Sequence, residues 1–126
     1  MPTIRHLALK TKTPAKLAEF YTQVFDMKII HTEKSGSVFL SDGYLTLALL
    51  RNRGEAAPSG FNHFGFQVED LKETQRRIEA AGGTFFFDLG DERQGTFERK
   101  FKDPDGVVFD ISEHGWIGTD GHKRRS

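Results

Sequence analysis

The sequence has 126 residues, of which 37% are hydrophobic and 29% charged, and its eighteen basic side chains balance eighteen acidic ones. This length suits a single domain, and the zero net charge argues against a dedicated nucleic-acid or membrane-surface binder. The chain contains no cysteine, which excludes disulfides, thiolate metal sites and a cysteine nucleophile. Neither a transmembrane run nor the apolar segment of a signal peptide is present in the sequence, so we expect a cytoplasmic protein.

The first half of the sequence predicts one strand, one helix and then three strands. Alternation predicts a strand over 4–10 that carries His6. Thr13 and Pro14 have the form of an N-cap followed by proline, and apolar residues at helical spacing predict a helix over 14–25. Further strands are expected over 28–32, 37–40 and 44–50, followed by a polar linker over 51–60.

The same order of elements then begins again. A strand over 62–68 carries His63 near its start, and Asp70 is expected to cap a helix that ends at Ala81-Gly82-Gly83. Strands are predicted over 85–89, 94–102 and 107–112, and the last two are joined by a turn at 103–106. The basic tail, residues 118–126, is expected to be disordered.

Matching landmarks indicate an internal duplication. His6 and His63 are 57 positions apart, and so are the predicted caps Thr13 and Asp70. The late turns at Asp42-Gly43 and Asp105-Gly106 are 63 positions apart, so the second half is slightly longer. A repeat of this length in two copies is typical of a duplicated module and not of a solenoid.

The duplication suggests a metal site. If the two halves pack about a pseudo-twofold axis, His6 and His63 can meet near it, and the last strand offers Asp110 four residues after Gly106. Two imidazoles and one carboxylate form a facial set with open positions that suits Fe, Mn, Co, Ni or Zn as divalent ions. The first-half equivalent of Asp110 is taken as Leu47, which cannot bind metal.

Each of these residues also has a simpler structural interpretation. A histidine on a strand is commonly a core or surface residue, and Asp110 alone could be merely polar. His114 follows on the Asp110 face and could act catalytically in proton transfer, or could simply turn the chain outward. The run Phe85-Phe86-Phe87 could line a cavity or bury a sheet face. Basic residues before the last turn could meet an anionic substrate or form a solvated edge; these are Arg93, Arg99 and Lys100.

Three segments resemble the vicinal oxygen chelate superfamily, namely residues 4–9, residues 61–70, and the 103–106 turn followed by Asp110. The resemblance covers about residues 3–115. It implies an α+β fold in which two tandem βαβββ modules, about 3–51 and 61–115, form a curled mixed sheet cleft within one domain of residues 1–117. It further implies a small-molecule substrate that chelates a divalent metal through adjacent oxygens, and a homodimer.

On this resemblance His6, His63 and Asp110 fall on the usual metal-ligand positions. Aspartate here replaces the usual, longer glutamate, and Leu47 stands where bacterial glyoxalases have a carboxylate. A second active-site histidine, as in ring-cleaving dioxygenases, has no candidate between residues 31 and 63. Ala8 stands where a fosfomycin-type threonine is expected.

These features predict a metal-dependent, glyoxalase- or dioxygenase-like enzyme with lyase, isomerase or ring-cleaving chemistry. The alternative is a metal-free protein that sequesters a small molecule or drug, as bleomycin-resistance proteins do. A structural or interaction module is the third hypothesis.

Overall fold

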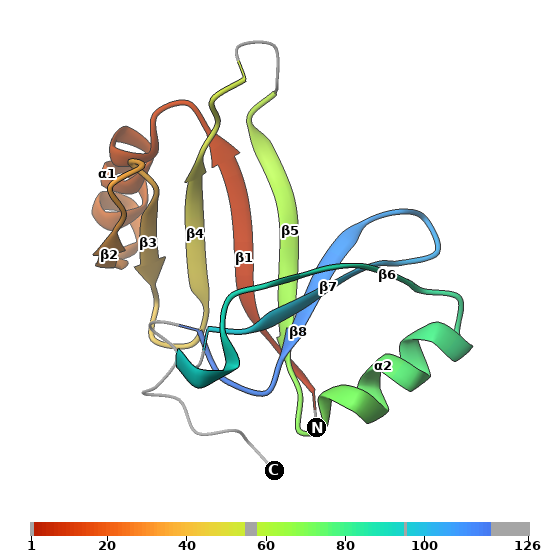
Figure 1. Cartoon of the computed structure of the whole chain (residues 1–126). Helices are drawn as coiled ribbons and strands as arrows, with labels where there is room; N and C mark the ends of the chain where they lie inside the picture. Colours follow the sequence, from red (N-terminus) through yellow and green to blue (C-terminus); the bar gives the residue numbers. More distant parts are fainter. Residues whose placement is uncertain (1, 55–57, 95, 117–126) are drawn as a thin grey trace. The chain divides into compact units, whose positions relative to one another are not determined.

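Two compact units make up the described part of the protein. The structure, a computed structural model, describes residues 2–54, 58–94 and 96–116. Residues 6–62 with Trp116 form module one, and residues 2–5 with 63–115 form module two. Each module has one α-helix and a mixed sheet (Figure 1), so the predicted α+β class and βαβββ order are confirmed. The cleft and the single domain of residues 1–117 stay predictions.

Module one follows the sequence prediction closely. Its elements in chain order are β1 (Thr3–Thr11), α1 (Pro14–Phe25), β2 (Lys28–Thr32), β3 (Val38–Ser41) and β4 (Thr46–Arg51). The strand order is β2-β3-β4-β1, with β1 parallel to β4 and the other pairs antiparallel. The helix α1 lies against β2, β3 and β4 (Figure 1). Its Ala18 packs with Val38, Leu40 and Leu49 in the core of this module.

Module two repeats this topology. Its elements are β5 (Gly60–Gln67), which enters the module at His63, α2 (Leu71–Ala80), β6 (Thr84–Leu89), the 3-10 turn η1 (Glu92–Gln94), β7 (Glu98–Lys102) and β8 (Val108–Ser112). The order is β5-β8-β7-β6, with β5 parallel to β8. Val68, Leu71, Phe101 and Ile111 form its core. Among the described residues no helix is long and apolar enough to cross a membrane.

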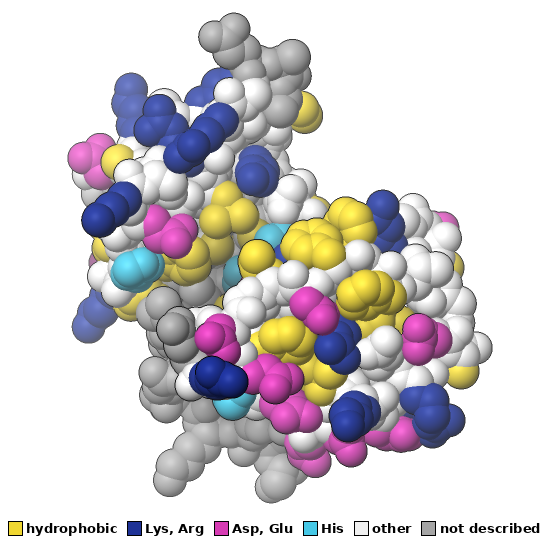
Figure 2. Space-filling model, in the orientation of Figure 1, with side chains coloured by type: hydrophobic (Ala, Val, Ile, Leu, Met, Phe, Trp, Pro, Cys, Tyr) yellow, Lys and Arg dark blue, Asp and Glu magenta, His cyan; other side chains and the backbone are white. Residues whose placement is uncertain are grey.

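The edge strand β6 exposes its phenylalanines. Phe85, Phe86 and Phe87 are 49%, 44% and 39% exposed, so the run does not bury a sheet face. The pairing with β7 is irregular between Phe85 and Phe87, and Lys102 Nζ lies 4.4 Å from the centre of the Phe86 ring. Figure 2 shows hydrophobic side chains beside basic ones over β6 and β7.

Two strands begin two or more residues later than predicted because side chains and backbone close local turns before them. The strand predicted from Tyr44 begins at Thr46, since Asp42 Oδ1 accepts hydrogen bonds from the amides of Tyr44 and Leu45, each at 2.8 Å. The strand predicted from residue 94 begins at 98, because the amide of Thr96 donates to the carbonyl of Asp91 at 3.1 Å and closes a loop around η1. The predicted disordered tail lies outside the described residues.

The two predicted helix caps differ in the structure. Asp70 Oδ1 accepts a hydrogen bond from the amide of Glu73 at 3.0 Å, as an N-cap does. Thr13 also occupies the predicted N-cap position, with proline after it, but its side chain makes no capping bond. The helix α1 begins there because Pro14 has its backbone angle preset and no amide hydrogen to satisfy.

We therefore expect Asp70→Ala to lower the free energy of unfolding by about 1 kcal/mol. Thr13→Ala, the change at the matching position of module one, is expected to cost only a few tenths of that, because no capping bond is lost. Urea denaturation of both variants at neutral pH measures the difference. Equal losses would show that the Asp70 bond contributes nothing specific.

Candidate functional site

Three buried polar side chains of module two meet on one face of its sheet. Asp110 on β8 pairs with Gly65 on β5 on one side and with Lys100 on β7 on the other. Directly opposite residues in neighbouring strands point to the same face. His63 lies two residues before Gly65 and therefore shares that face, and Gly65 itself adds no side chain to it. The strand pairing thus brings His63, Lys100 and Asp110 together, and we call them the His63–Lys100–Asp110 cluster.

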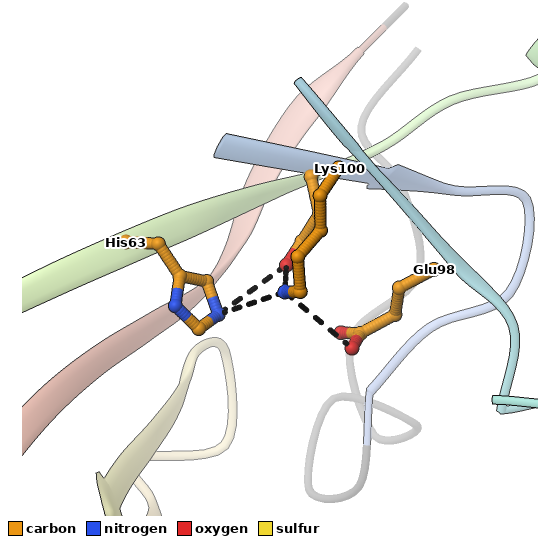
Figure 3. A network of polar contacts seen from close by, with 4 residues as sticks. His63, Glu98 and Lys100 are labelled. Carbon is orange, nitrogen blue, oxygen red and sulfur yellow. Dashed lines mark hydrogen bonds and ion pairs between the residues drawn. The ribbon is translucent and has the colours of Figure 1, made fainter. Parts of the chain in front are cut away.

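The Lys100 ammonium holds the cluster together. Its Nζ donates a hydrogen bond to Asp110 Oδ2 at 2.8 Å and lies 3.3 Å from His63 Nε2. His63 Nε2 and Asp110 Oδ2 are also 3.3 Å apart. Glu98 Oε1 lies 4.0 Å from the same ammonium (Figure 3). The exposed fractions are 0% for Asp110, 5% for Lys100 and 8% for His63, so this is a water-poor site.

The hydrogen-bonding roles in the cluster depend on the tautomer of His63. An ammonium group can only donate hydrogen bonds. In the tautomer that carries its proton on Nδ1, His63 Nε2 accepts from Lys100 with its one lone pair; in the other neutral tautomer, Nε2 can donate to Asp110 Oδ2 at 3.3 Å. In the first tautomer, two of the three N–H bonds of Lys100 are directed to Asp110 and His63. Within the described residues no further acceptor lies at hydrogen-bonding distance from the third.

Asp110 has an unusual electrostatic environment. Burial raises the pKa of its carboxyl to about 7, and the negative charge of Glu98 adds to the rise, whereas the Lys100 ammonium opposes it. One carboxylate oxygen bonds to Lys100, and the other, Oδ1, accepts no hydrogen bond from any residue that the structure describes. A proton or a hydrogen-bond donor at Oδ1 would therefore be stabilised.

Strand register corrects one expectation about the repeat. Asp110 pairs with the residue two after His63, and in module one the residue two after His6 is Ala8, which pairs with Ala48. The counterpart of Asp110 is thus Ala48 and not Leu47. The error arose because positions were counted from the turn glycine, and Gly43 lies three residues before the start of β4 whereas Gly106 lies two residues before the start of β8. Ala48, like Leu47, offers no ligand atom.

The other predicted site residues have different surroundings. His6 belongs to module one, where it is buried and its ring stacks on Trp116 with centres 5.2 Å apart. Its role as a third metal ligand stays a prediction. His114 follows the end of β8 and is exposed. It lines a pocket of about 450 Å³ together with residues of α2 and β7, and no member of the His63–Lys100–Asp110 cluster lines that pocket. The catalytic role of His114 also stays a prediction.

Arg99, one of the predicted anion contacts, is instead paired within module two. Its guanidinium bonds to Asp88 at 2.8 Å and to Gln75 at 2.9 Å. Arg93 lies within η1 and is exposed. Lys100 was recognised only as a possible anion contact, and Glu98 was missed. The sequence held a signal for Lys100, because a hairpin around the 103–106 turn places it opposite Asp110.

Basic residues line a second pocket in module one. The cavity, of about 550 Å³, is formed by the end of β1, the β2–β3 turn and the end of β4, with Lys12, Lys34, Arg51 and Arg53 among its lining residues. Because these long side chains are exposed, their charges are screened by solvent.

Comparison with known proteins identifies a family. The family model of the Glyoxalase/Bleomycin resistance protein/Dioxygenase superfamily matches residues 3–111, which confirms the resemblance predicted from the sequence. A lactoylglutathione lyase of Arabidopsis thaliana is 29% identical over 123 residues, covering 87% of this chain but 44% of that protein. A probable lactoylglutathione lyase of Vibrio parahaemolyticus is 26% identical over 124 residues, covering 88% of this chain and 90% of that protein. The chain thus spans less than half of the length of the plant relatives.

Solved structures show the same fold at lower identity. The 2,3-dioxygenase LapB from Pseudomonas sp. KL28 matches with a TM-score of 0.72 at 17% identity, over 94% of this chain and 42% of that one. Methylmalonyl-CoA epimerase from Mycobacterium tuberculosis matches with a TM-score of 0.68 at 16% identity, over 90% and 88% of the two chains. At these identities the likeness establishes the fold alone.

Proposed function

The chain belongs to the Glyoxalase/Bleomycin resistance protein/Dioxygenase superfamily, and on that premise we propose that it is a lyase or isomerase that moves a proton on a small substrate with adjacent oxygens. The observation that carries this proposal is the buried His63–Lys100–Asp110 cluster. A carboxylate, an ammonium and a neutral imidazole within 3.3 Å of one another offer both proton transfer and charge stabilisation at one place.

The chemistry follows from the atoms that the cluster presents. The proton on a carbon beside a carbonyl would move to Asp110 Oδ1, and the carbonyl π electrons would move onto the carbonyl oxygen. The third N–H of Lys100 would stabilise that oxyanion, an interaction that strengthens in a dry site. Return of the proton to the opposite face of the same carbon completes an epimerisation; return to the former carbonyl carbon, with the proton of the adjacent hydroxyl passing to the oxyanion, completes an isomerisation, and neither needs an oxidant or reductant. Because the pKa of Asp110 is about 7, its carboxyl can both accept and release a proton near neutral pH.

The names of the compared proteins support this class of substrate. A lactoylglutathione lyase and a methylmalonyl-CoA epimerase are each named for a thioester. In both thioesters the carbon beside the carbonyl carries an oxygen-bearing group and a removable proton. A catechol dioxygenase among the similar structures is named for a ring with two adjacent oxygens. Adjacent oxygens are the chemistry that these substrates share.

A divalent ion, which the resemblance implies, does not fit the cluster as it stands. The Lys100 ammonium lies 2.8 Å from Asp110 Oδ2 and 3.3 Å from His63 Nε2, so an ion bound by both of these atoms would meet it. A bound ion would also face a buried positive charge beside Asp110. We therefore derive no step through a metal, and the predicted Fe, Mn, Ni, Co or Zn site with its ring-cleaving chemistry stays a prediction.

Deuterium exchange tests the proposal without knowledge of the natural product. The protein is incubated in D₂O with S-lactoylglutathione, methylmalonyl-CoA or dihydroxyacetone, and NMR follows exchange at the carbon beside the carbonyl. We expect the wild type to accelerate exchange of at least one probe and Asp110→Asn to slow it by about 100-fold or more. The matched control is Asp88→Asn, which changes an exposed carboxylate paired with Arg99 and is expected to leave the rate unchanged. No exchange with any probe, or equal rates in both variants, contradicts the proposal.

The exposed aromatic run on β6 favours a second candidate function, a metal-free binding protein. Phe86 with Lys102 above its ring could hold an aromatic anion through stacking and charge. Thermal shift with small aromatic compounds, with and without chelator, separates the two functions, because binding without exchange indicates sequestration.

The predicted homodimer is tested separately by sedimentation at micromolar concentration.

A further inference from the structure

We propose that Lys100 is a built-in cation that takes the place of a divalent metal ion at His63 and Asp110 and keeps such an ion out. That the same ammonium then holds a substrate oxyanion rests on the proposed function. The exclusion of metal does not rest on it, because it concerns only the protein and the ion.

The donor atoms are arranged as for a shared cation. His63 Nε2 and Asp110 Oδ2 lie 3.3 Å apart, a separation that two ligands of one ion also show when each bond is about 2.0–2.2 Å. The Lys100 ammonium is 2.8 Å from the oxygen and 3.3 Å from the nitrogen, so it lies beside both of the atoms that a shared ion would contact. An ion and the ammonium therefore compete directly for these atoms.

The ammonium is also held firmly in its place. Lys100 is 5% exposed and stands directly opposite Asp110 in the β7–β8 pair. Its Nζ lies 5.9 Å from the centre of the Phe87 ring and 4.0 Å from Glu98 Oε1, and both surroundings favour a positive charge. Withdrawing it would leave the charge of Asp110 buried without a counter-ion, which is costly.

The other module supports a paired role for the lysine and the aspartate. Ala48 is the counterpart of Asp110, and its antiparallel partner is Phe39. Phe39 is thus the counterpart of Lys100. Module one has two apolar residues where module two has an ammonium and a carboxylate, so the two charges occur together in one module and are both missing from the other.

Metal titration of full-length variants tests the inference. The wild type, Lys100→Met, Lys100→Arg and Lys102→Met are titrated with Co²⁺ and with Zn²⁺, followed by calorimetry and by the visible spectrum of Co²⁺. Methionine keeps the length of the side chain but removes the charge, arginine keeps the charge, and Lys102→Met makes the same change outside the cluster. We expect Lys100→Met alone to bind one equivalent of ion, at least tenfold more tightly than the wild type, and expect His63→Ala in the same background to abolish the gain.

Two results would overturn the inference. Tight binding of one ion by the wild type, lost on His63→Ala, would show that Lys100 does not exclude metal. Binding by neither the wild type nor Lys100→Met would show that His63 and Asp110 form no cation site once the ammonium is gone. Circular dichroism and thermal melting confirm that each variant is folded, and Lys100→Gln serves where methionine prevents folding. Since no substrate is used, a failed exchange assay leaves this measurement intact.

Discussion

The free energy of unfolding of the wild type is expected to fall, relative to that of Asp110→Asn, as the pH rises from about 4 to about 7. Asp110 is fully buried, and its pKa is about 7 in the folded protein against an ordinary value of 3.8. Burial is the main cause of this rise, and the charge of Glu98 adds to it. The asparagine variant has no proton to exchange at this position, so the difference between the two proteins isolates Asp110.

The sign follows from proton binding. Between the two pKa values the folded protein retains a proton that the unfolded chain has already released. Raising the pH therefore favours the unfolded chain, until Asp110 is ionised in both states above about pH 7. A pKa difference of this size corresponds to at most about 4 kcal/mol of lost stability across the range. This is the reverse of an ordinary ion-paired aspartate, whose stabilising effect is lost at low pH.

Chemical denaturation at pH steps of about one unit measures the effect in both proteins. Asp88→Asn is the control, because it removes a carboxylate that is also paired with a basic side chain but lies at the surface. It is expected to keep the pH dependence of the wild type. If the wild type and Asp110→Asn instead give parallel curves, Asp110 is ionised throughout and Lys100 outweighs burial.

The elements of the fold and two members of the cluster could be predicted from the sequence because each has a local signal. Alternation and helical spacing predicted both helices and the strands, and the repeat predicted that His63 and Asp110 belong to one site. These signals depend on residues close together in the chain or on matching positions. They do not depend on which strands become neighbours.

What was missed depends on strand pairing. Lys100 lies among basic residues that are commonly solvated, and only its register with Asp110 reveals that it is buried. Leu47 was taken as the counterpart in place of Ala48 because positions were counted from a turn glycine, which lies one residue further from β4 than from β8. Arg5 on β1, only 1% exposed, is a further case, since a charged residue on a strand is ordinarily assigned to solvent.

Phe101→Ala is expected to lower the free energy of unfolding by about 3–5 kcal/mol. Phe101 is fully buried, and its ring stacks on Phe109 at 5.8 Å and meets Phe85 edge-on at 6.0 Å. It packs in the core of module two with Ile111, so alanine would leave a large cavity. Phe86→Ala, at a site that is 44% exposed, removes the same ring from the surface and is expected to cost less than about 1 kcal/mol. Urea denaturation of both variants measures the two losses.

The same variant tests how far the cluster depends on the core. Phe101 follows Lys100 on β7 and therefore points to the opposite face of the sheet. If the cluster is positioned by strand pairing alone, Phe101→Ala lowers the free energy of unfolding by the same amount at every pH. The fall in stability with rising pH that is assigned to Asp110 then persists in this variant. If that fall with pH disappears in Phe101→Ala, the contact between Lys100 and Asp110 is maintained by packing on the far side of β7. The proton position at Asp110 would then be set by the hydrophobic core and not only by its immediate neighbours.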